Sequence, residues 1–440
     1  MVPIRGVVAA ALAVLLVSAG LLAQPQPAAQ TPPTTVEPGQ PAAGGGPTVE
    51  PPPAAEGTET TPPAEGNQTA PPPEAVAPNF DFEADAVPAN WQATDAEARL
   101  AITHEAANVG GGKGALEATY SWGDRQGVVE VFAARNLAVP GGSVLSFRIR
   151  TSEPTSISFA VTEQDGSMYQ GFLCQPAGAW SLVQARLPEL QLMDNSQDED
   201  GKLDVDQITE VSFQDLANLG GELERALGWK TGEQKMWLDD VTIDDRAVAG
   251  RVTAQDDTVV LDGFDTDAIF ALPIRGAALE KAPGAPATIG TQSLRMGYRL
   301  GGGRYVGFVA GIETADLAGM KSLSLQLKSE AAARVVVVLE ERDGSKYETA
   351  LRPTGDNQWQ KVDLPLELMQ LSDDTTDENG QLDTDQLRVL IVVVDTFDAD
   401  VNPQGDGAVY LDDVTAHLAA GTGPATAPGR VVPISFQVPG

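Results

Sequence analysis

Hydrophobic and polar residues alternate with a period of two in many short stretches of this chain. In LSFRIR (residues 145–150), Leu145, Phe147 and Ile149 alternate with polar residues, and LSLQLK (323–328) repeats the pattern. Because successive side chains of a strand point to opposite faces, the pattern predicts antiparallel strands with one buried face. Many such short strands with few helical stretches predict an all-β fold of two stacked sheets, a β-sandwich of jelly-roll type.

The same alternation places several aromatic residues in the core. Tyr120 and Trp122 share the parity of Leu116, and Tyr169 shares the parity of Leu173. We therefore expect these three aromatic side chains to be buried. One short helix or turn is expected at LDVDQI and again at LDTDQL.

The region after the N-terminal 78 residues is a tandem repeat. DGSMY (165–169) returns as DGSKY (343–347), WLDDVTI (237–243) returns as YLDDVTA (410–416), and Trp180 matches Trp359. The order of the matches is preserved, which indicates duplication of a whole domain. The Asp-Gly pair in the first motif predicts a tight hairpin in each copy. We predict two tandem antiparallel sandwiches with these bounds: repeat 1 over 79–245, a linker over 246–258, repeat 2 over 259–418 and a tail over 419–440.

The first 78 residues have a different composition. One arginine precedes an apolar run that ends near residue 23, which is the pattern of a secretory signal peptide over residues 1–23. An uncleaved membrane anchor is the alternative for this run. Residues 24–78 are rich in Pro, Gly and Thr and poor in large apolar side chains, so they predict a disordered linker. The sequence therefore predicts a protein that is secreted, extracellular or tethered to the cell surface.

Charge and residue usage exclude several classes of function. The chain has 62 Asp and Glu against 28 Lys and Arg, a net charge of −34, and no basic stripe. Such a chain repels nucleic acid and anionic membranes, so we expect neither partner and no membrane insertion beyond the signal segment. Cys174 is the one cysteine, and there are two histidines, which leaves little material for zinc or histidine-based catalysis.

Two acidic loops suggest calcium as a cofactor. DEDGKLDVDQI (198–208) returns as DENGQLDTDQL (377–387), but neither loop has the terminal carboxylates of an EF-hand. A looser oxygen cage is one interpretation, and a solvated acidic turn with an Asp at its start is the other. The candidate ligands of the cage are Asp198, Asp200, Asp204, Asp377 and Asp383.

The order of several motifs resembles a known superfamily. FDFEADAVPANW near the start, GKGALEATY, an acidic loop and the closing WLDDVTI are similar to the galactose-binding-domain-like jelly rolls, which include many carbohydrate-binding modules. The resemblance covers both repeats. It implies a structural calcium where the first and last strands meet, with Glu83, Asp239, Asp240, Asp265, Asp412 and Asp413 as ligands. The alternative is that one Asp of each pair bonds to backbone while the other is solvated.

A sugar-binding face needs exposed aromatic and polar side chains. Parity places Arg148 and Arg150 outside the sandwich and allows Phe172 to be exposed. Trp180 and Trp359 fit either a shared packing role or a ligand platform. The ligand residues predicted are Arg148, Arg150, Phe172, Trp180, Gln326, Lys328 and Trp359.

These observations predict a non-catalytic binding protein of two jelly-roll modules whose ligand is a polysaccharide or envelope glycan. Two modules that engage one polymer would gain avidity. The alternative is a structural or protein-interaction module of the cell envelope. An enzyme is not expected, because the carboxylates gather in the repeated loops rather than flanking a cleft.

Overall fold

A computed structural model of the 440-residue chain gives the fold. It describes residues 77, 79–193, 196–199, 201–246, 248, 257–286, 290–300, 305–312, 317–395 and 405–419. The predicted signal peptide, nearly all of the predicted linker 24–78, most of the linker 246–258 and the tail beyond residue 419 lie outside the described residues. Among the described residues, the structure contains no helix that is both long and apolar enough to cross a membrane.

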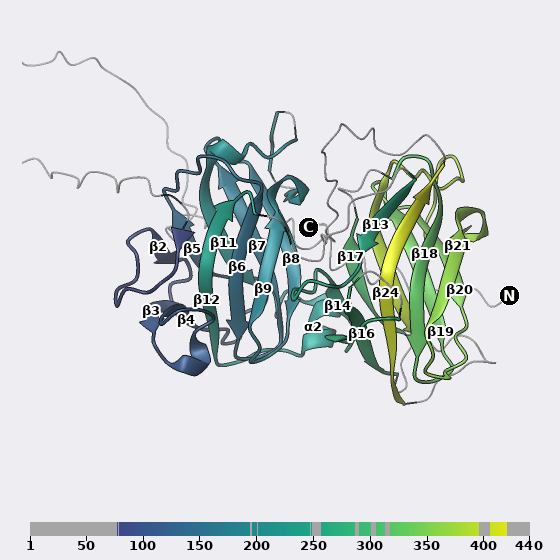
Figure 1. Ribbon diagram of the computed structural model, residues 1–440, viewed down its shortest axis with the longest axis horizontal. Helices are drawn as coiled ribbons and strands as arrows, with labels where there is room; N and C mark the ends of the chain where they lie inside the picture. Colours follow the sequence, from purple (N-terminus) through teal and green to yellow (C-terminus); the bar gives the residue numbers. More distant parts are fainter. Residues whose placement is uncertain are drawn as a thin grey trace, which may run out of the picture. The chain divides into compact units, whose positions relative to one another are not determined.

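Repeat 1 is a sandwich of two antiparallel sheets (Figure 1). Its front sheet has the order β3-β4-β12-β6-β9, with β1 also paired to β12, and its back sheet has the order β10-β8-β7-β11-β5-β2. The strands are β1 (Asn79–Phe80), β2 (Trp91–Ala93), β3 (Arg99–Thr103), β4 (Ala115–Ser121), β5 (Val129–Arg135), β6 (Val144–Thr151), β7 (Thr155–Glu163), β8 (Met168–Gln175), β9 (Ser181–Arg186), β10 (Gln191–Leu192), β11 (Ile208–Asp215) and β12 (Glu233–Asp244).

Repeat 2 has the same architecture. Its front sheet has the order β15-β16-β24-β18-β21, with β13 paired to β24, and its back sheet has the order β14-β17-β23-β19-β20-β22. The strands are β13 (Thr258–Asp262), β14 (Leu272–Ile274), β15 (Ala278–Pro283), β16 (Gln292–Arg299), β17 (Tyr305–Gly311), β18 (Met320–Ser329), β19 (Arg334–Glu341), β20 (Lys346–Leu351), β21 (Gln360–Pro365), β22 (Gln370–Leu371), β23 (Leu387–Asp395) and β24 (Asp406–Leu418). The predicted all-β tandem sandwich is confirmed.

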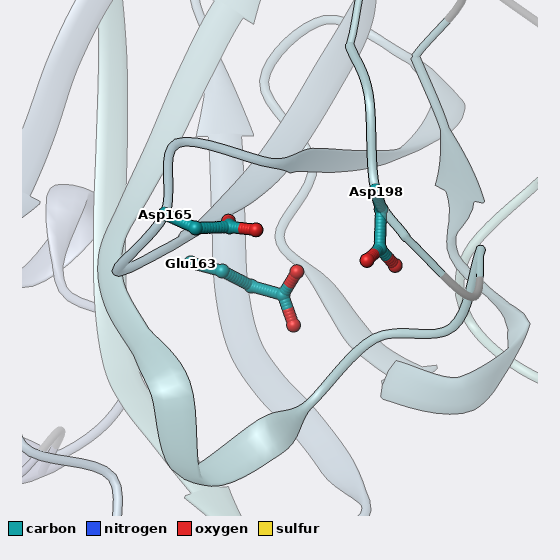
Figure 2. A group of neighbouring side chains, drawn as sticks. All are labelled: Glu163, Asp165 and Asp198. Atoms are coloured by element: carbon teal, nitrogen blue, oxygen red, sulfur yellow. The ribbon is translucent and has the colours of Figure 1, made fainter.

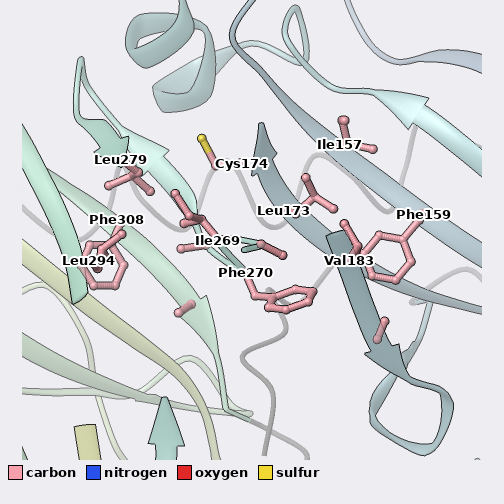
Figure 3. Packing of buried hydrophobic residues seen from close by; sticks show 14 of the residues in the cluster. Ile157, Phe159, Leu173, Cys174, Val183, Ile269, Phe270, Leu279, Leu294 and Phe308 are labelled. Atoms are coloured by element: carbon pink, nitrogen blue, oxygen red, sulfur yellow. The ribbon is translucent and has the colours of Figure 1, made fainter. Parts of the chain in front are cut away.

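The core follows from the period-two pattern. Leu145, Phe147 and Ile149 are fully buried between the sheets of repeat 1, and Leu323, Leu325 and Leu327 occupy the matching place in repeat 2. Tyr120, Trp122 and Tyr169 are also buried, as their parity predicted. Figure 3 shows part of this packing, including Phe159, Leu173 and Val183 of repeat 1.

Helical structure is sparse in the described part of the chain. The turn expected at LDVDQI is the 3-10 helix η3 (Val205–Gln207), and the remaining 3-10 turns are η1 (Ala106–Asn108), η2 (Leu187–Glu189) and η4 (Leu366–Leu368). The α-helix α2 (Gly221–Leu227) was not predicted, because its seven residues are too few for a clear helical period. Its Leu223 is fully buried, so tertiary packing holds this short helix.

The two sandwiches belong to one compact unit of the chain. The backbone N–H of Cys174, on the edge of the repeat 1 back sheet, donates to the carbonyl of Ile269 at 2.9 Å (Figure 3). Cys174 is 7% exposed, and burial raises its thiol pKa to about 12. A thiol that stays protonated is a poor nucleophile, so Cys174 acts as a small packing residue.

Candidate functional site

The outward face of the repeat 2 front sheet carries a half-buried aromatic pair. Trp359 directly precedes β21, and Tyr410 lies on β24. Their ring centroids are 6.2 Å apart, with ring planes at 73°. Lys328 of β18 lies directly across from Tyr410 in the sheet register, and its Nζ is 3.8 Å from the Tyr410 ring centroid and 5.0 Å from that of Trp359. We call Trp359 and Tyr410 the aromatic platform.

Polar side chains surround the aromatic platform. The Tyr410 hydroxyl donates to Glu330 at 2.6 Å, and Arg295 lies over the Tyr410 ring at 6.0 Å while pairing with Glu280 at 3.0 Å. Gln326 is two residues before Lys328 on the same outward face. A surface with aromatic rings and mixed hydrogen-bond donors and acceptors has the composition of a binding site for a polyhydroxylated ligand.

The matching face of repeat 1 is closed. Trp237, which occupies the position of Tyr410, is 5% exposed and donates its Nε1–H to Glu117 at 2.7 Å. Arg150 lies over the Trp237 ring at 4.8 Å and donates to the carbonyl of Ala107 at 2.8 Å, which ties down the loop containing η1. A cation lies over the matching ring in both repeats, but in repeat 1 that cation also holds a loop against the face, and the ring is 5% exposed.

Trp180 has a packing role in repeat 1. A Cβ added at Gly110 would lie 3.0 Å from both the Trp180 ring and the Arg148 side chain, so the loop lies against these two residues. The structure thus brings Arg148, Arg150 and Trp180 together under a loop. It brings Gln326, Lys328 and Trp359 together on a more open face.

Phe172 does not belong to either group. Its parity is opposite to that of Leu173, as the sequence indicated, but it is 2% exposed. It lies in a separate apolar cluster with Leu219 and Leu223, on the outward side of the back sheet. The expectation that Phe172 is exposed is wrong, because period-two alternation identifies the face of a sheet but not what packs on that face.

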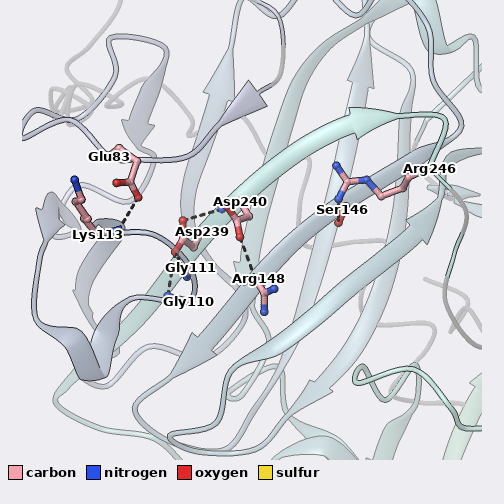
Figure 4. Close-up of polar contacts among 9 residues, drawn as sticks. All are labelled: Glu83, Gly110, Gly111, Lys113, Ser146, Arg148, Asp239, Asp240 and Arg246. Carbon is pink, nitrogen blue, oxygen red and sulfur yellow. Dashed lines mark hydrogen bonds and ion pairs between the residues drawn. The ribbon is translucent and has the colours of Figure 1, made fainter.

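The junction of first and last strands in repeat 1 is bonded by protein groups (Figure 4). Asp239 is fully buried, and its Oδ2 accepts the backbone N–H groups of Gly110 at 3.0 Å and Gly111 at 2.8 Å. Glu83 Oε1 accepts the N–H of Lys113 at 2.7 Å, and Asp240 pairs with Arg148 at 3.0 Å. Burial raises the pKa of Asp239 to about 6. One Asp thus bonds to backbone and the other pairs with Arg148, while calcium at this junction stays a prediction.

The same junction in repeat 2 contains an ammonium group. Lys281 of β15 donates from Nζ to the carbonyl of Phe264 at 3.0 Å. Burial lowers the pKa of Lys281 to about 8, while Asp262, Asp265, Asp267 and Asp412 favour its charged form.

The remaining predicted ligands of this junction bond to backbone or lie close by. Asp265 Oδ1 accepts the N–H of Thr291 at 2.7 Å, and Asp412 Oδ2 accepts the N–H of Ala285 at 2.7 Å. The pKa of Asp413 is raised by burial and by the charge of Asp265. In repeat 1, Ile102 holds the position of Lys281, since Ile102 and Lys281 pair with the matching residues Leu116 and Leu294.

The acidic loops meet the preceding hairpins. Carboxylate oxygens of Glu163, Asp165 and Asp198 all lie within 4.8 Å of one another and point toward a common centre (Figure 2). Glu341, Asp343 and Asp377 form the same group in repeat 2. We call these the hairpin clusters. Burial raises the pKa of Glu341 to about 7, and the pKa of Glu163 is raised for the same reason.

The other predicted loop ligands are placed differently. The backbone N–H of Asp204 bonds to Glu163, but the Asp204 carboxylate accepts from Gln207 at 2.9 Å. The Asp383 carboxylate accepts from Asn379 at 2.8 Å. Neither carboxylate is in a hairpin cluster, and their role as calcium ligands stays a prediction. Asp200 lies outside the described residues.

Several candidate residues were missed by sequence reasoning. Tyr410 was not proposed as a ligand residue, although its match to Trp237 marks an aromatic position shared by both repeats. The hairpin members of the clusters were missed as well. The signal was TEQDGS in repeat 1 and EERDGS in repeat 2, where an acid precedes the Asp-Gly turn by two residues. These hairpin members are Glu163, Asp165, Glu341 and Asp343.

A scan against models of protein families finds no match for the chain. A search of the curated proteins also finds no match. Among solved structures, the chain is similar to the family 11 carbohydrate-binding module of the cellulosomal cellulase Lic26A-Cel5E of Clostridium thermocellum, at 14% identity and a TM-score of 0.28 over 39% of this chain and 97% of that one.

Two further solved structures illustrate the range of matches. The CBM22-1–CBM22-2 tandem domain of Xyn10C from Paenibacillus barcinonensis is 12% identical, covers 80% of this chain and 99% of that one, and has a TM-score of 0.24. An exo-β-agarase is 17% identical over 39% of this chain and 25% of that one, with a TM-score of 0.29. The strand orders show two antiparallel sandwiches in tandem, which is the fold that the resemblance implied.

Proposed function

We propose that this protein is a secreted, non-catalytic polysaccharide-binding protein whose binding surface is the outward face of the repeat 2 front sheet. The observation that carries the proposal is the aromatic platform. Trp359 and Tyr410 keep part of their ring surface accessible on a sheet face, next to Gln326, Lys328 and Glu330. Sugar rings present apolar C–H faces that pack on aromatic rings, and their hydroxyls bond to the polar side chains alongside.

The chemistry near the aromatic platform supports binding rather than hydrolysis. Glycoside hydrolysis uses two carboxyl groups that flank the scissile bond. Two carboxylates beside the platform, Glu280 and Glu330, are engaged by Arg295 and by the Tyr410 hydroxyl. Export is proposed from the N-terminal signal pattern, and the predicted linker would hold the repeats away from the N-terminus.

Affinity electrophoresis of the full chain tests this function. The gels contain xylan, mixed-linked β-glucan, β-1,4-galactan or agarose, and we expect at least one polymer to retard the wild type. Trp359→Ala should weaken binding at least tenfold, since a central aromatic contact contributes about 2 kcal/mol. Trp180→Ala is the matched control, and its binding should equal that of the wild type.

Two results would contradict the proposal. Retardation by none of the polymers, from a protein shown to be folded, would remove glycan binding. Capture of a cell-envelope protein by the wild type and its loss in Trp359→Ala would assign the face to the alternative, protein recognition.

We also propose calcium as the ion of the hairpin clusters. Three carboxylates within 4.8 Å repel one another unless a proton or cation neutralises them, and oxygen ligands of this kind suit calcium. For a dissociation constant of about 1 mM, 10 mM calcium would stabilise the fold by about 1.4 kcal/mol. The expected result is a rise in melting temperature that is lost in Glu341→Gln combined with Glu163→Gln. An equal rise in that double variant would show that calcium acts elsewhere.

A further inference from the structure

A groove lies beside the aromatic platform on the repeat 2 front sheet. It has a volume of about 420 Å³, and the residues that line it include Ala278, Arg295, Gly297, Tyr298, Arg299 and Glu330. These residues come from β15, β16 and the end of β18. We call it the front-sheet groove.

The register of three strands explains why the sheet is hollowed here. Ala278 of β15 pairs with Gly297 of β16, which pairs in turn with Ala408 of β24. Three small residues thus lie side by side across the sheet. A groove of about 390 Å³ occupies the matching place in repeat 1, but there the row consists of Arg99, Thr119 and Lys235.

The sandwich interior below the front-sheet groove contains an unsatisfied polar group. Tyr298 is 4% exposed, and its hydroxyl has no hydrogen-bond partner. In repeat 1 the matching Tyr120 donates its hydroxyl hydrogen to Asp215 at 2.6 Å. Val394 holds the position of Asp215 in repeat 2, because Gln214 and Val393 precede them at matching points of β11 and β23. A buried hydroxyl without a partner is costly, and because it lies on the core side of β16, a ligand in the groove does not contact it.

The front-sheet groove is continuous with the aromatic platform. Arg295 and Glu330 line the groove, and the same two side chains contact the ring and the hydroxyl of Tyr410. A chain molecule lying on the platform therefore reaches the groove without leaving the sheet face. The floor of small residues leaves room for a ring at that point.

The charges of the groove are paired. Arg299 makes two bonds to Asp406, at 2.9 and 3.0 Å, and Arg295 pairs with Glu280 at 3.0 Å. The chain as a whole has a net charge of −34, which disfavours binding of an anionic polymer. Paired groups of this kind still offer hydrogen-bond donors and acceptors to hydroxyl groups.

We propose that the front-sheet groove is a subsite for one uncharged sugar ring of a neutral polysaccharide whose neighbouring ring stacks on Trp359 and Tyr410. The inference rests on the proposed function and adds to it the charge class of the ligand and a second point of contact. Repeat 1 has Arg99, Thr119 and Lys235 in place of the small-residue floor, so it does not share this subsite.

Gly297→Thr is the decisive variant, because it gives repeat 2 the residue that repeat 1 carries at Thr119. A Cβ at Gly297 would meet only the flexible Arg295 guanidinium, at 3.0 Å, and Ala278, at 3.7 Å, so the fold tolerates it. We expect binding of xylan, mixed-linked β-glucan or β-1,4-galactan to weaken at least tenfold in the full chain, at an unchanged melting temperature. Thr119→Gly in repeat 1 is the control and should bind like the wild type.

Tyr298→Phe removes a hydroxyl that lies inside the sandwich, so it is a second control and should bind like the wild type. Polygalacturonate, an anionic polymer, should bind at least tenfold more weakly than the best neutral polymer. If Gly297→Thr binds like the wild type while Trp359→Ala does not, the groove is no subsite and the platform stands. Preferred binding of polygalacturonate would overturn the neutral class, and no binding of any polymer by the wild type would instead remove the proposed function.

Discussion

The front sheets of the two repeats share a scaffold but differ in what covers them. In repeat 1 the closing-strand aromatic, Trp237, is 5% exposed beneath Arg150, whose guanidinium also bonds to the loop at Ala107. In repeat 2 the matching Tyr410 is half-buried beside Trp359. Duplication thus kept the apolar character of most inward positions, as at Phe147 and Leu325, and changed the outward residues. Outward positions tolerate such change because they do not fill the core.

The interiors differ at one buried polar group. Asp215 of repeat 1 is 2% exposed and accepts hydrogen bonds from Tyr120, Trp122 and Thr155. Repeat 2 has Val394 at this position and leaves the Tyr298 hydroxyl without a partner. The matching tyrosine hydroxyl is therefore hydrogen-bonded in the core of repeat 1 and has no partner in the core of repeat 2.

Replacement of Asp215 should have the largest effect on the free energy of unfolding. Asp215→Val copies repeat 2 and leaves the donors of Tyr120, Trp122 and Thr155 unsatisfied, so we expect unfolding free energy to fall by about 3–5 kcal/mol. Urea unfolding followed by tryptophan fluorescence measures it, since Trp359 alone of the six tryptophans lies in repeat 2. Adding Tyr120→Phe should recover part of the lost unfolding free energy, because it removes one of the unsatisfied donors. A loss below about 1 kcal/mol would show that Asp215 is not the centre of a stabilising network.

The junctions of first and last strands in the two repeats should differ in how their contribution to stability depends on pH. The folded-state pKa of Lys281, lowered by burial to about 8, lies below the unfolded value of about 10.4. The unfolded state therefore binds more protons between these values, and stability rises with pH from about 8 to about 10.4, by about 3 kcal/mol in total. Calorimetry of wild type and Lys281→Ile across this range measures the difference. If the free energy of unfolding depends on pH in the same way in both proteins, burial does not destabilise the charged form of Lys281. Ile102→Val in repeat 1 serves as the control.

Trp180 and Trp359, which match in the two repeats, should contribute differently to the free energy of unfolding. Trp180 packs beneath the Gly110 loop, so Trp180→Ala should lower the free energy of unfolding by about 2 kcal/mol, less than for a fully buried tryptophan. Trp359→Ala should change it by no more than about 0.5 kcal/mol, because the ring contacts the outward side chains of Tyr410 and Lys328 rather than a backbone loop. Thermal unfolding of both variants decides the matter. Equal losses would mean that Trp359 has a packing role too.

The smallest effect concerns the loop that closes the repeat 1 face. A Cβ at Gly110 would lie 3.0 Å from Trp180 and from Arg148, so Gly110→Ala must displace one of them, at a cost of about 1 kcal/mol. Gly201→Ala is a steric control with open space around its Cβ, although its φ of 68° adds backbone strain. Unfolding midpoints of the two variants, measured with the change in Trp180 fluorescence, test the contact. An unchanged fluorescence spectrum in Gly110→Ala would argue against close packing at this point.

Much of the fold could be predicted from residue patterns alone. Alternation at 145–150 and 323–328 gave the inward face of β6 and β18, and the repeated motifs gave two sandwiches. The site was harder to predict. Trp359, Lys328 and Gln326 were proposed from parity, but Tyr410 was overlooked, because only the pairing of β18 with β24 places it against Lys328. The prediction that Phe172 is exposed was wrong for the opposite reason, since its side chain faces outward but other residues cover it.

The acidic residues show the same division. Repetition in the sequence marked Asp198 and Asp377, but the partners from the preceding hairpin, Glu163 and Glu341, emerge only when β7 and β19 are folded against the loops. The amino-acid sequence by itself determined the strand faces, the duplication and the acidic character, because these depend on neighbours along the chain. The tertiary structure decided that the Trp237 ring is covered while Tyr410 is half-buried. It also decided which tyrosine hydroxyl lacks a partner and which carboxylates lie close together. Those properties depend on register and loop packing between strands distant in sequence, which local periodicity does not encode.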